Sequence, residues 1–136
     1  MKIGLLEDNP AICDLITTAL ELVDHTVVSY TYGASLLEAL FTKYNIVERS
    51  LPYDLLLVDL SLPGELSGLA VIYHIHETLV PLTLPIIVIS GAGQHELDII
   101  YKRYPTIPVL RKPFSIKTLL DTIAKQHCTA NGMLVD

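Results

Sequence analysis

An aspartate, Asp59, directly follows the apolar run of residues 55–58, which contains only leucine and valine. Such a run is typical of a strand that is buried on both faces, as in a parallel sheet covered by helices. Open α/β sheets place their ligands and their chemistry at the carboxyl ends of these strands. Asp59 therefore suits a reactive or ligand-binding carboxylate. Taken alone, it fits a simple turn before Pro63 about equally well, because aspartate is common in turns.

Three further predicted strands end in side chains with related chemistry. In chain order, the polar residues at the four strand ends are Glu7 and Asp8, Asp59, Ser90 and Lys112. The carboxyl ends of parallel strands lie at one edge of a sheet, so we expect these side chains to converge. Chance placement of suitable residues at all four ends is much less plausible than at any one end.

These residue types fit phosphoryl chemistry. The carboxylates of Glu7, Asp8 and Asp59 would repel one another without a cation, and a hard divalent ion such as Mg²⁺ takes oxygen ligands. With Asp59 as the nucleophile, the metal and the Lys112 ammonium can neutralise the charge of an incoming phosphoryl group. The Ser90 hydroxyl can donate to a phosphoryl oxygen. The set predicts a magnesium-dependent phosphoacceptor site.

The elements that must position these residues alternate between strand and helix. Runs rich in apolar and β-branched residues predict strands at residues 2–6, 26–32, 55–59, 85–90 and 107–111. Apolar residues spaced by three and four predict helices from Asn9-Pro10 to about residue 23, after a cap at Ser35, and at about residues 69–79, 95–104 and 115–127. Five strand-helix units with short connections imply right-handed crossovers and a parallel sheet with helices on both faces.

Length and composition predict one globular domain, residues 1–127, with a short tail at residues 128–136. The chain has 136 residues, of which 51% are hydrophobic, and this composition excludes disorder. Its net charge of −6 gives no electrostatic footprint for nucleic acid or an anionic membrane. No apolar run reaches the roughly 18 residues that a membrane span needs, and no signal peptide is recognisable. We therefore expect a cytoplasmic protein with reduced cysteines.

Four ordered motifs resemble the receiver domain of the two-component response regulator family. They are Leu-Leu-Glu-Asp-Asn at residues 5–9, Asp59 with Pro63 four residues later, Ser90 after residues 86–89, and Lys-Pro-Phe at residues 112–114. No single motif is decisive, but the ordered set is specific, and the match covers about residues 2–127. The resemblance implies a flavodoxin-like, doubly wound (βα)5 fold whose five-stranded parallel sheet has the strand order 2-1-3-4-5.

The resemblance also implies a role for each residue at the strand ends. Asp59 is expected to be the phosphoacceptor, Lys112 to contact the phosphoryl group, and Ser90 to supply the switch hydroxyl. The implied ligands of Mg²⁺, directly or through water, are Glu7, Asp8, Asp59 and the backbone carbonyl of Ser61. The peptide bond between Lys112 and Pro113 is expected to be cis.

The function implied by the resemblance is a signalling module. Asp59 would accept a phosphoryl group from a histidine kinase or a phosphotransfer protein, and the chain would catalyse only its own phosphorylation and dephosphorylation. The output would be another protein, or a second copy of the chain, bound at the fourth helix, fifth strand and fifth helix. The basic residues expected on that face are Lys102, Arg103, Arg111 and Lys117. They suit an acidic protein partner, and we expect no nucleic acid or membrane partner.

Two features depart from the family pattern. The loop at residues 63–68 is one residue longer than usual. Val109 stands where the family usually has tyrosine or phenylalanine, so the switch cannot be the rotation of a large ring.

The residues two beyond Asp59 and Ser90, which are Ser61 and Ala92, are small, and they predict easy access of water and a short-lived phosphorylated state.

Other function classes fit the sequence less well. A magnesium phosphohydrolase with an aspartyl nucleophile would usually show Asp-x-Asp after the first strand, whereas this chain has Asp8-Asn9-Pro10. A flavodoxin-like flavin binder needs a phosphate loop at that position, and the carboxylates of Glu7 and Asp8 would repel the phosphate. An adapter that works without phosphorylation remains a variant of the signalling module.

Overall fold

The structure, a computed structural model, describes residues 1–42, 51–62, 66–78, 84–91 and 94–130. Along this part of the chain, strands and helices alternate in the order β1 (Lys2–Leu6), α1 (Pro10–Glu21), β2 (Thr26–Tyr30), α2 (Gly33–Thr42), β3 (Leu55–Asp59), α3 (Gly68–Thr78), β4 (Ile86–Ser90), α4 (Gln94–Arg103), β5 (Val109–Arg111) and α5 (Ile116–Ala130). No helix within these ranges combines the length and the apolar character needed to cross a membrane.

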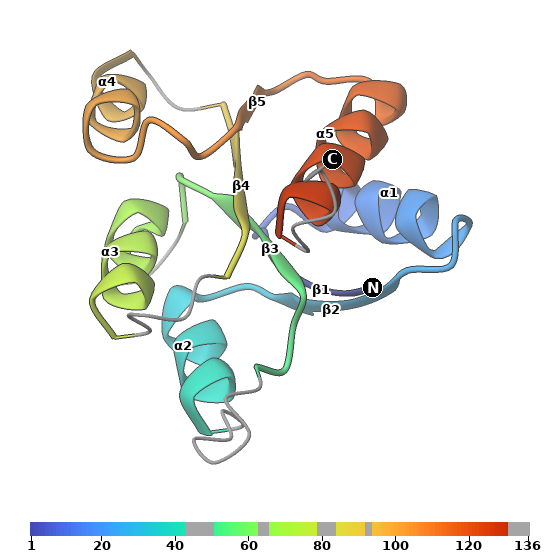
Figure 1. The fold of residues 1–136 in the computed structure, drawn as a ribbon, viewed down its shortest axis with the longest axis horizontal. Helices are drawn as coiled ribbons and strands as arrows, with labels where there is room; N and C mark the ends of the chain where they lie inside the picture. The colour runs from blue at the N-terminus through green and yellow to red at the C-terminus, as the bar shows by residue number, and fades with distance from the viewer. Residues whose placement is uncertain (43–50, 63–65, 79–83, 92–93, 131–136) are drawn as a thin grey trace.

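The strands form one parallel sheet in the order β2-β1-β3-β4-β5. This confirms the predicted fold class and strand order. Helices cover both faces: α1 and α5 lie on one side of the sheet, and α2, α3 and α4 lie on the other (Figure 1). Neighbouring strands end together at one edge, because Asp59 on β3 pairs with Ile89, and Ser90 on β4 pairs with Arg111.

The central strand shows why an uninterrupted apolar run is needed here. Leu55 and Leu57 join the hydrophobic core beneath α1 and α5, whereas Leu56 and Val58 join the core beneath α2, α3 and α4. All four side chains are completely buried. Successive strand residues point to opposite faces, so a strand covered on both sides has no position for a polar residue until it ends at Asp59.

Several element boundaries differ from the sequence prediction. The second helix begins at Gly33 and not after a cap at Ser35. At Gly33 a Cβ atom would lie 2.6 Å from Val71 Cγ2, so glycine lets α2 approach α3 closely. The second strand ends at Tyr30, where its pairing with β1 ends, and the fifth strand begins only after Pro108, which has no N–H to donate. The last helix continues past the predicted end near residue 127, to Ala130.

A tyrosine pair closes the core beneath α2. The hydroxyl groups of Tyr30 and Tyr53 are hydrogen-bonded, and their rings meet edge to face with centroids 6.3 Å apart. Tyr53 is only 4% exposed, and burial, together with the bond to Tyr30, raises the pKa of its phenol far above the ordinary value. The phenol therefore stays protonated in the folded chain at pH values where an unfolded chain would lose the proton.

This shift predicts an alkaline loss of stability that Tyr53→Phe reduces. Because the folded pKa is raised, the contribution of Tyr53 is complete below its unfolded pKa and is lost as pH rises above it. At pH 10.5, this one group should lower the free energy of unfolding by roughly 0.8 kcal/mol relative to pH 7, from its unfolded pKa of about 10. Urea unfolding at both pH values measures the difference. An equal loss in wild type and Tyr53→Phe would contradict the assignment.

Candidate functional site

Asp59 is a buried carboxylate at the carboxyl end of β3. It is 2% exposed, its Oδ1 accepts a hydrogen bond of 3.0 Å from the Ser61 backbone N–H, and its Oδ2 accepts one of 3.1 Å from Lys112 Nζ. A backbone donor and a cation therefore fix the two oxygens separately.

Glu7 reaches the same cation from the end of β1. It is 3% exposed, and its Oε1 lies 2.9 Å from Lys112 Nζ, while its Oε2 accepts a hydrogen bond of 3.1 Å from the backbone N–H of Asn9. Within the described chain, Oε1 has no hydrogen-bond partner beyond this ion pair. The side chain of Asn9 caps α1 by accepting from the N–H groups of Ala11 and Ile12.

Lys112 links the three strand ends. Burial alone would lower the pKa of its ammonium, but its contacts with Glu7 and Asp59 outweigh burial, and the net pKa is raised. Its backbone N–H also donates to the Ser90 carbonyl at 2.8 Å, which holds the end of β4 against the segment that leaves β5. The following Lys112–Pro113 peptide bond is cis. Lys112 thus remains a cation throughout the neutral pH range.

Ser90 lies on β4, the strand next to Asp59 and β3, and Val109 lies on β5, one strand further from Asp59. Ser90 is the last residue of β4 and is 1% exposed, and it pairs with Arg111 on β5. Val109 is half-buried, pairs with Val88 and packs against the core beneath α2, α3 and α4. Ala92, predicted to tune water access together with Ser61, lies outside the described residues, as do residues 63–65 of the longer loop.

The acidic residues form a cluster with the donor chemistry of a hard cation. One carboxylate oxygen each from Glu7, Asp8 and Asp59 lies within 4.8 Å of the others. Glu7 and Asp59 are buried, whereas Asp8 is exposed and open to solvent. Three carboxylates face one ammonium, so the cluster carries an excess of negative charge, and all its donors are oxygen atoms. Both properties fit a divalent ion such as Mg²⁺. A ligand role for the Ser61 carbonyl stays a prediction.

Gly68, at the end of the loop predicted at residues 63–68, positions the strand that carries Asp59. It is buried at the start of α3, and its N–H donates to the Leu60 carbonyl at 3.3 Å. A Cβ atom at this position would lie 2.1 Å from the backbone carbonyl oxygen of Asp59 and 2.7 Å from Leu60 Cα. Only glycine permits this approach. Nothing in the sequence except the identity of the residue itself indicates it.

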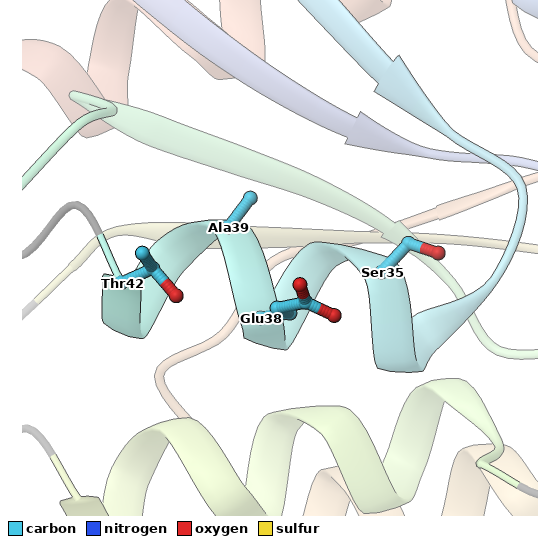
Figure 2. Close-up of a pocket in the computed structure, with 4 residues that line it drawn as sticks. All are labelled: Ser35, Glu38, Ala39 and Thr42. Carbon is cyan, nitrogen blue, oxygen red and sulfur yellow. The ribbon is translucent and has the colours of Figure 1, made fainter.

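A hollow over α2 is separate from this cluster. It has a volume of about 380 Å³ and is lined by Ser35, Glu38, Ala39 and Thr42, which all come from one helix (Figure 2). None of the residues with predicted phosphoryl chemistry contributes to it. The strand ends therefore remain the place where the described side chains converge for chemistry.

Comparison with known proteins agrees with this arrangement. A family model described as "response regulator receiver domain" matches residues 3–124. A CheY-like response regulator receiver domain protein from Methanospirillum hungatei JF-1 superposes with a TM-score of 0.81 at 20% identity, covering 97% of each chain. The signal receiver domain of a modulated diguanylate cyclase from Desulfovibrio desulfuricans G20 gives 0.77 at 21% identity, covering 96% of this chain and 95% of that one. NtrX from Brucella abortus gives 0.75 at 27% identity, covering 96% of this chain but 27% of NtrX. The comparison with curated proteins finds no match.

The close approach at Gly68 predicts that Gly68→Ala is destabilising. The new methyl group must push α3 away from the backbone of Asp59 and Leu60, and overpacking of this kind costs about 1–3 kcal/mol. Gly91→Ala is the matched control, because its Cβ would lie 3.8 Å from the nearest atom, Lys112 Cδ. It should change stability by about 0.5 kcal/mol or less. Urea unfolding of both variants measures the contrast, and equal effects would refute it.

Proposed function

Because the chain belongs to the response regulator receiver domain family and is a phosphoacceptor signalling module, we propose that Asp59 is its phosphoacceptor. One observation carries this assignment. Asp59 is the carboxylate that is buried at a strand end, oriented by a backbone N–H, paired with Lys112 and adjacent to two further acids. Asp8 is exposed, and Glu7 is already engaged by Lys112 and by the Asn9 backbone.

In the proposed reaction, a carboxylate oxygen of Asp59 attacks the phosphorus atom of the donor. The new oxygen–phosphorus bond forms as the bond to the leaving group breaks, and the leaving group departs with the electron pair of that bond. Lys112 supports this step by placing its positive charge next to the attacking carboxylate and the incoming phosphoryl oxygens. The Ser90 hydroxyl, at the end of the adjacent strand, is proposed to donate to a phosphoryl oxygen once the group is attached.

Glu7, Asp8, Asp59 and the Ser61 carbonyl are proposed to hold Mg²⁺, with Glu7 acting through water. When bound, the ion neutralises phosphoryl charge and lowers the repulsion among the three carboxylates. Glu7 is assigned the indirect role because its oxygens already contact Lys112 and the Asn9 N–H. Its main effect would be to position Lys112, while the exposed carboxylate of Asp8 admits the ion from solvent.

The proposed donor of the phosphoryl group is a histidine kinase or a phosphotransfer protein, and the proposed location is the cytoplasm. The proposed output is the binding of another protein, or of a second copy of the chain, at α4, β5 and α5. The chain would act on no substrate other than its own phosphoryl group. A magnesium phosphohydrolase remains the alternative class. It would release phosphate from many donors with turnover, whereas a receiver accepts one phosphoryl group per chain and then hydrolyses it.

The assignment predicts labelling at Asp59. Incubation with Mg²⁺ and a small phosphodonor such as acetyl phosphate should add one phosphoryl group per chain, measured by intact mass, and Asp59→Asn should abolish the addition. Asp54→Asn is the matched control, because Asp54 is an exposed aspartate at the other end of β3, where it caps the Lys2 N–H. This control should label like wild type. Undiminished labelling of Asp59→Asn would show that another residue is the acceptor.

The charge balance predicts a magnesium-dependent stability of Lys112→Met. Removing the ammonium leaves the buried carboxylates of Glu7 and Asp59 without their cation, which should lower the free energy of unfolding by about 3 kcal/mol without metal. Saturating Mg²⁺ should recover much of this loss, because the ion supplies the missing positive charge. Lys117→Met is the control: its ion pair with Asp121 is exposed, so about 0.5 kcal/mol or less is expected. A loss that Mg²⁺ leaves unchanged would contradict metal binding at this cluster.

A further inference from the structure

A group of aromatic and basic side chains joins α3 to α4 on the outside of the molecule. The guanidinium carbon of Arg103 lies 5.4 Å from the ring centroid of Tyr73 and 6.0 Å from that of Tyr104. The ring of His76 meets Tyr104 edge to face, with centroids 4.8 Å apart. We call Tyr73, His76, Arg103 and Tyr104 the α3–α4 cluster. The two helices that carry it lie next to each other on the same face of the sheet (Figure 1).

The α3–α4 cluster corrects the orientation expected for Arg103. The sequence predicts this residue on the face of α4, β5 and α5, but its side chain extends toward α3. Leu97 and Ile100 are completely buried and anchor α4 in the core. Arg103 is exposed and is not part of that core. The cluster is therefore a surface distinct from the face predicted for output.

The cluster is accessible to a partner. Tyr73 is 41% exposed, His76 and Arg103 are also exposed, and Tyr104 is half-buried. Tyrosine and arginine are the residue types that most often dominate binding at protein interfaces. Here their rings and guanidinium are already ordered against one another, so a partner would not have to immobilise long, free side chains. The α3–α4 cluster is therefore suited to binding another protein.

The charge of Arg103 is not neutralised within the described part of the chain. Its contacts there are the two tyrosine rings, and no described carboxylate lies within ion-pair distance. Glu77 and Glu96 stand on the same two helices, and neither forms an ion pair with it. Lys102, the preceding residue on α4, is also an exposed cation, in a chain whose net charge is −6. A carboxylate from outside would meet a preformed cation here, whereas a polyanion such as nucleic acid would be repelled by the rest of the chain.

We propose that the α3–α4 cluster binds an acidic segment of a partner protein. A carboxylate of the segment pairs with Arg103, and a neighbouring apolar side chain packs on the ring of Tyr73. The cluster is complete without a phosphoryl group on Asp59, so this surface is a second interaction site beside the face formed by α4, β5 and α5. The proposed binding at this cluster does not depend on the assignment of Asp59 as the phosphoacceptor.

Selection of random twelve-residue peptides displayed on phage, against the full unphosphorylated chain, tests the proposal. The selected peptides should be enriched in Asp and Glu next to an apolar residue. Synthetic copies should bind Arg103→Gln and Tyr73→Ala at least about tenfold more weakly than wild type, the loss expected for hot-spot residues. Circular dichroism verifies that each variant is folded, and both positions are exposed, so the fold should be retained.

Two matched controls separate recognition from general effects. Lys2→Gln removes the same unit of charge from an exposed position on β1, and Tyr32→Ala removes a ring that is 51% exposed elsewhere. Both should bind the peptides like wild type. Enrichment of basic or uncharged peptides, no enrichment at all, or equal losses in the control variants would overturn the proposal. Self-association of the chain in sedimentation velocity that Arg103→Gln abolishes would also overturn the proposal. Binding of a twelve-nucleotide single-stranded DNA that Arg103→Gln abolishes would do the same. Either result would identify a different occupant of the α3–α4 cluster.

Discussion

The ion pairs of Lys112 with Glu7 and Asp59 are the interaction on which the site depends. Two carboxylates are more than nine-tenths buried at the ends of neighbouring strands, where each would be costly without an opposite charge. The single ammonium lies within 3.1 Å of both. The arrangement still has one negative charge too many before Asp8 is counted. That residual charge keeps the edge of the sheet attractive to a second cation, and it makes the position of Lys112 sensitive to whatever binds there.

The sheet makes this convergence possible because it is parallel and covered on both faces. The central strand must be apolar along its whole length, so Asp59 can appear only where the strand leaves the core. Gly68 then brings the first turn of α3 against the backbone of Asp59 and Leu60, and the hydrogen bond to Leu60 holds it there. The first turn of α3 therefore packs against the backbone of Asp59, while the Asp59 carboxylate faces Lys112 at the edge of the sheet.

The sequence predicted the parts of the structure that depend on local pattern. Apolar runs and the residues at their ends were sufficient to bring Glu7, Asp59 and Lys112 to one edge, because strand direction decides where those residues lie. Contacts between elements distant in the sequence were not predictable. The need for glycine at Gly68 depends on how closely α3 approaches β3, and the direction of Arg103 depends on which neighbour α4 packs against. The start of α2 is displaced for the same reason, because Gly33 lets this helix approach Val71 on α3.

Val109 on β5 has no ring that could rotate, so the position of α4 as a whole is the feature to consider. This helix is held by two kinds of contact. Leu97 and Ile100 are fully buried, and each such side chain contributes about 1.5–3 kcal/mol through burial. The contact of Arg103 with Tyr73 is exposed, and cation–π contacts at exposed sites contribute about 0.5–1 kcal/mol. A small displacement of α4 would keep the buried contacts and break the exposed one first, since the exposed contact is weaker and bridges two helices. The geometry of the surface between α3 and α4 is therefore a more sensitive reporter of the position of α4 than the core beneath it.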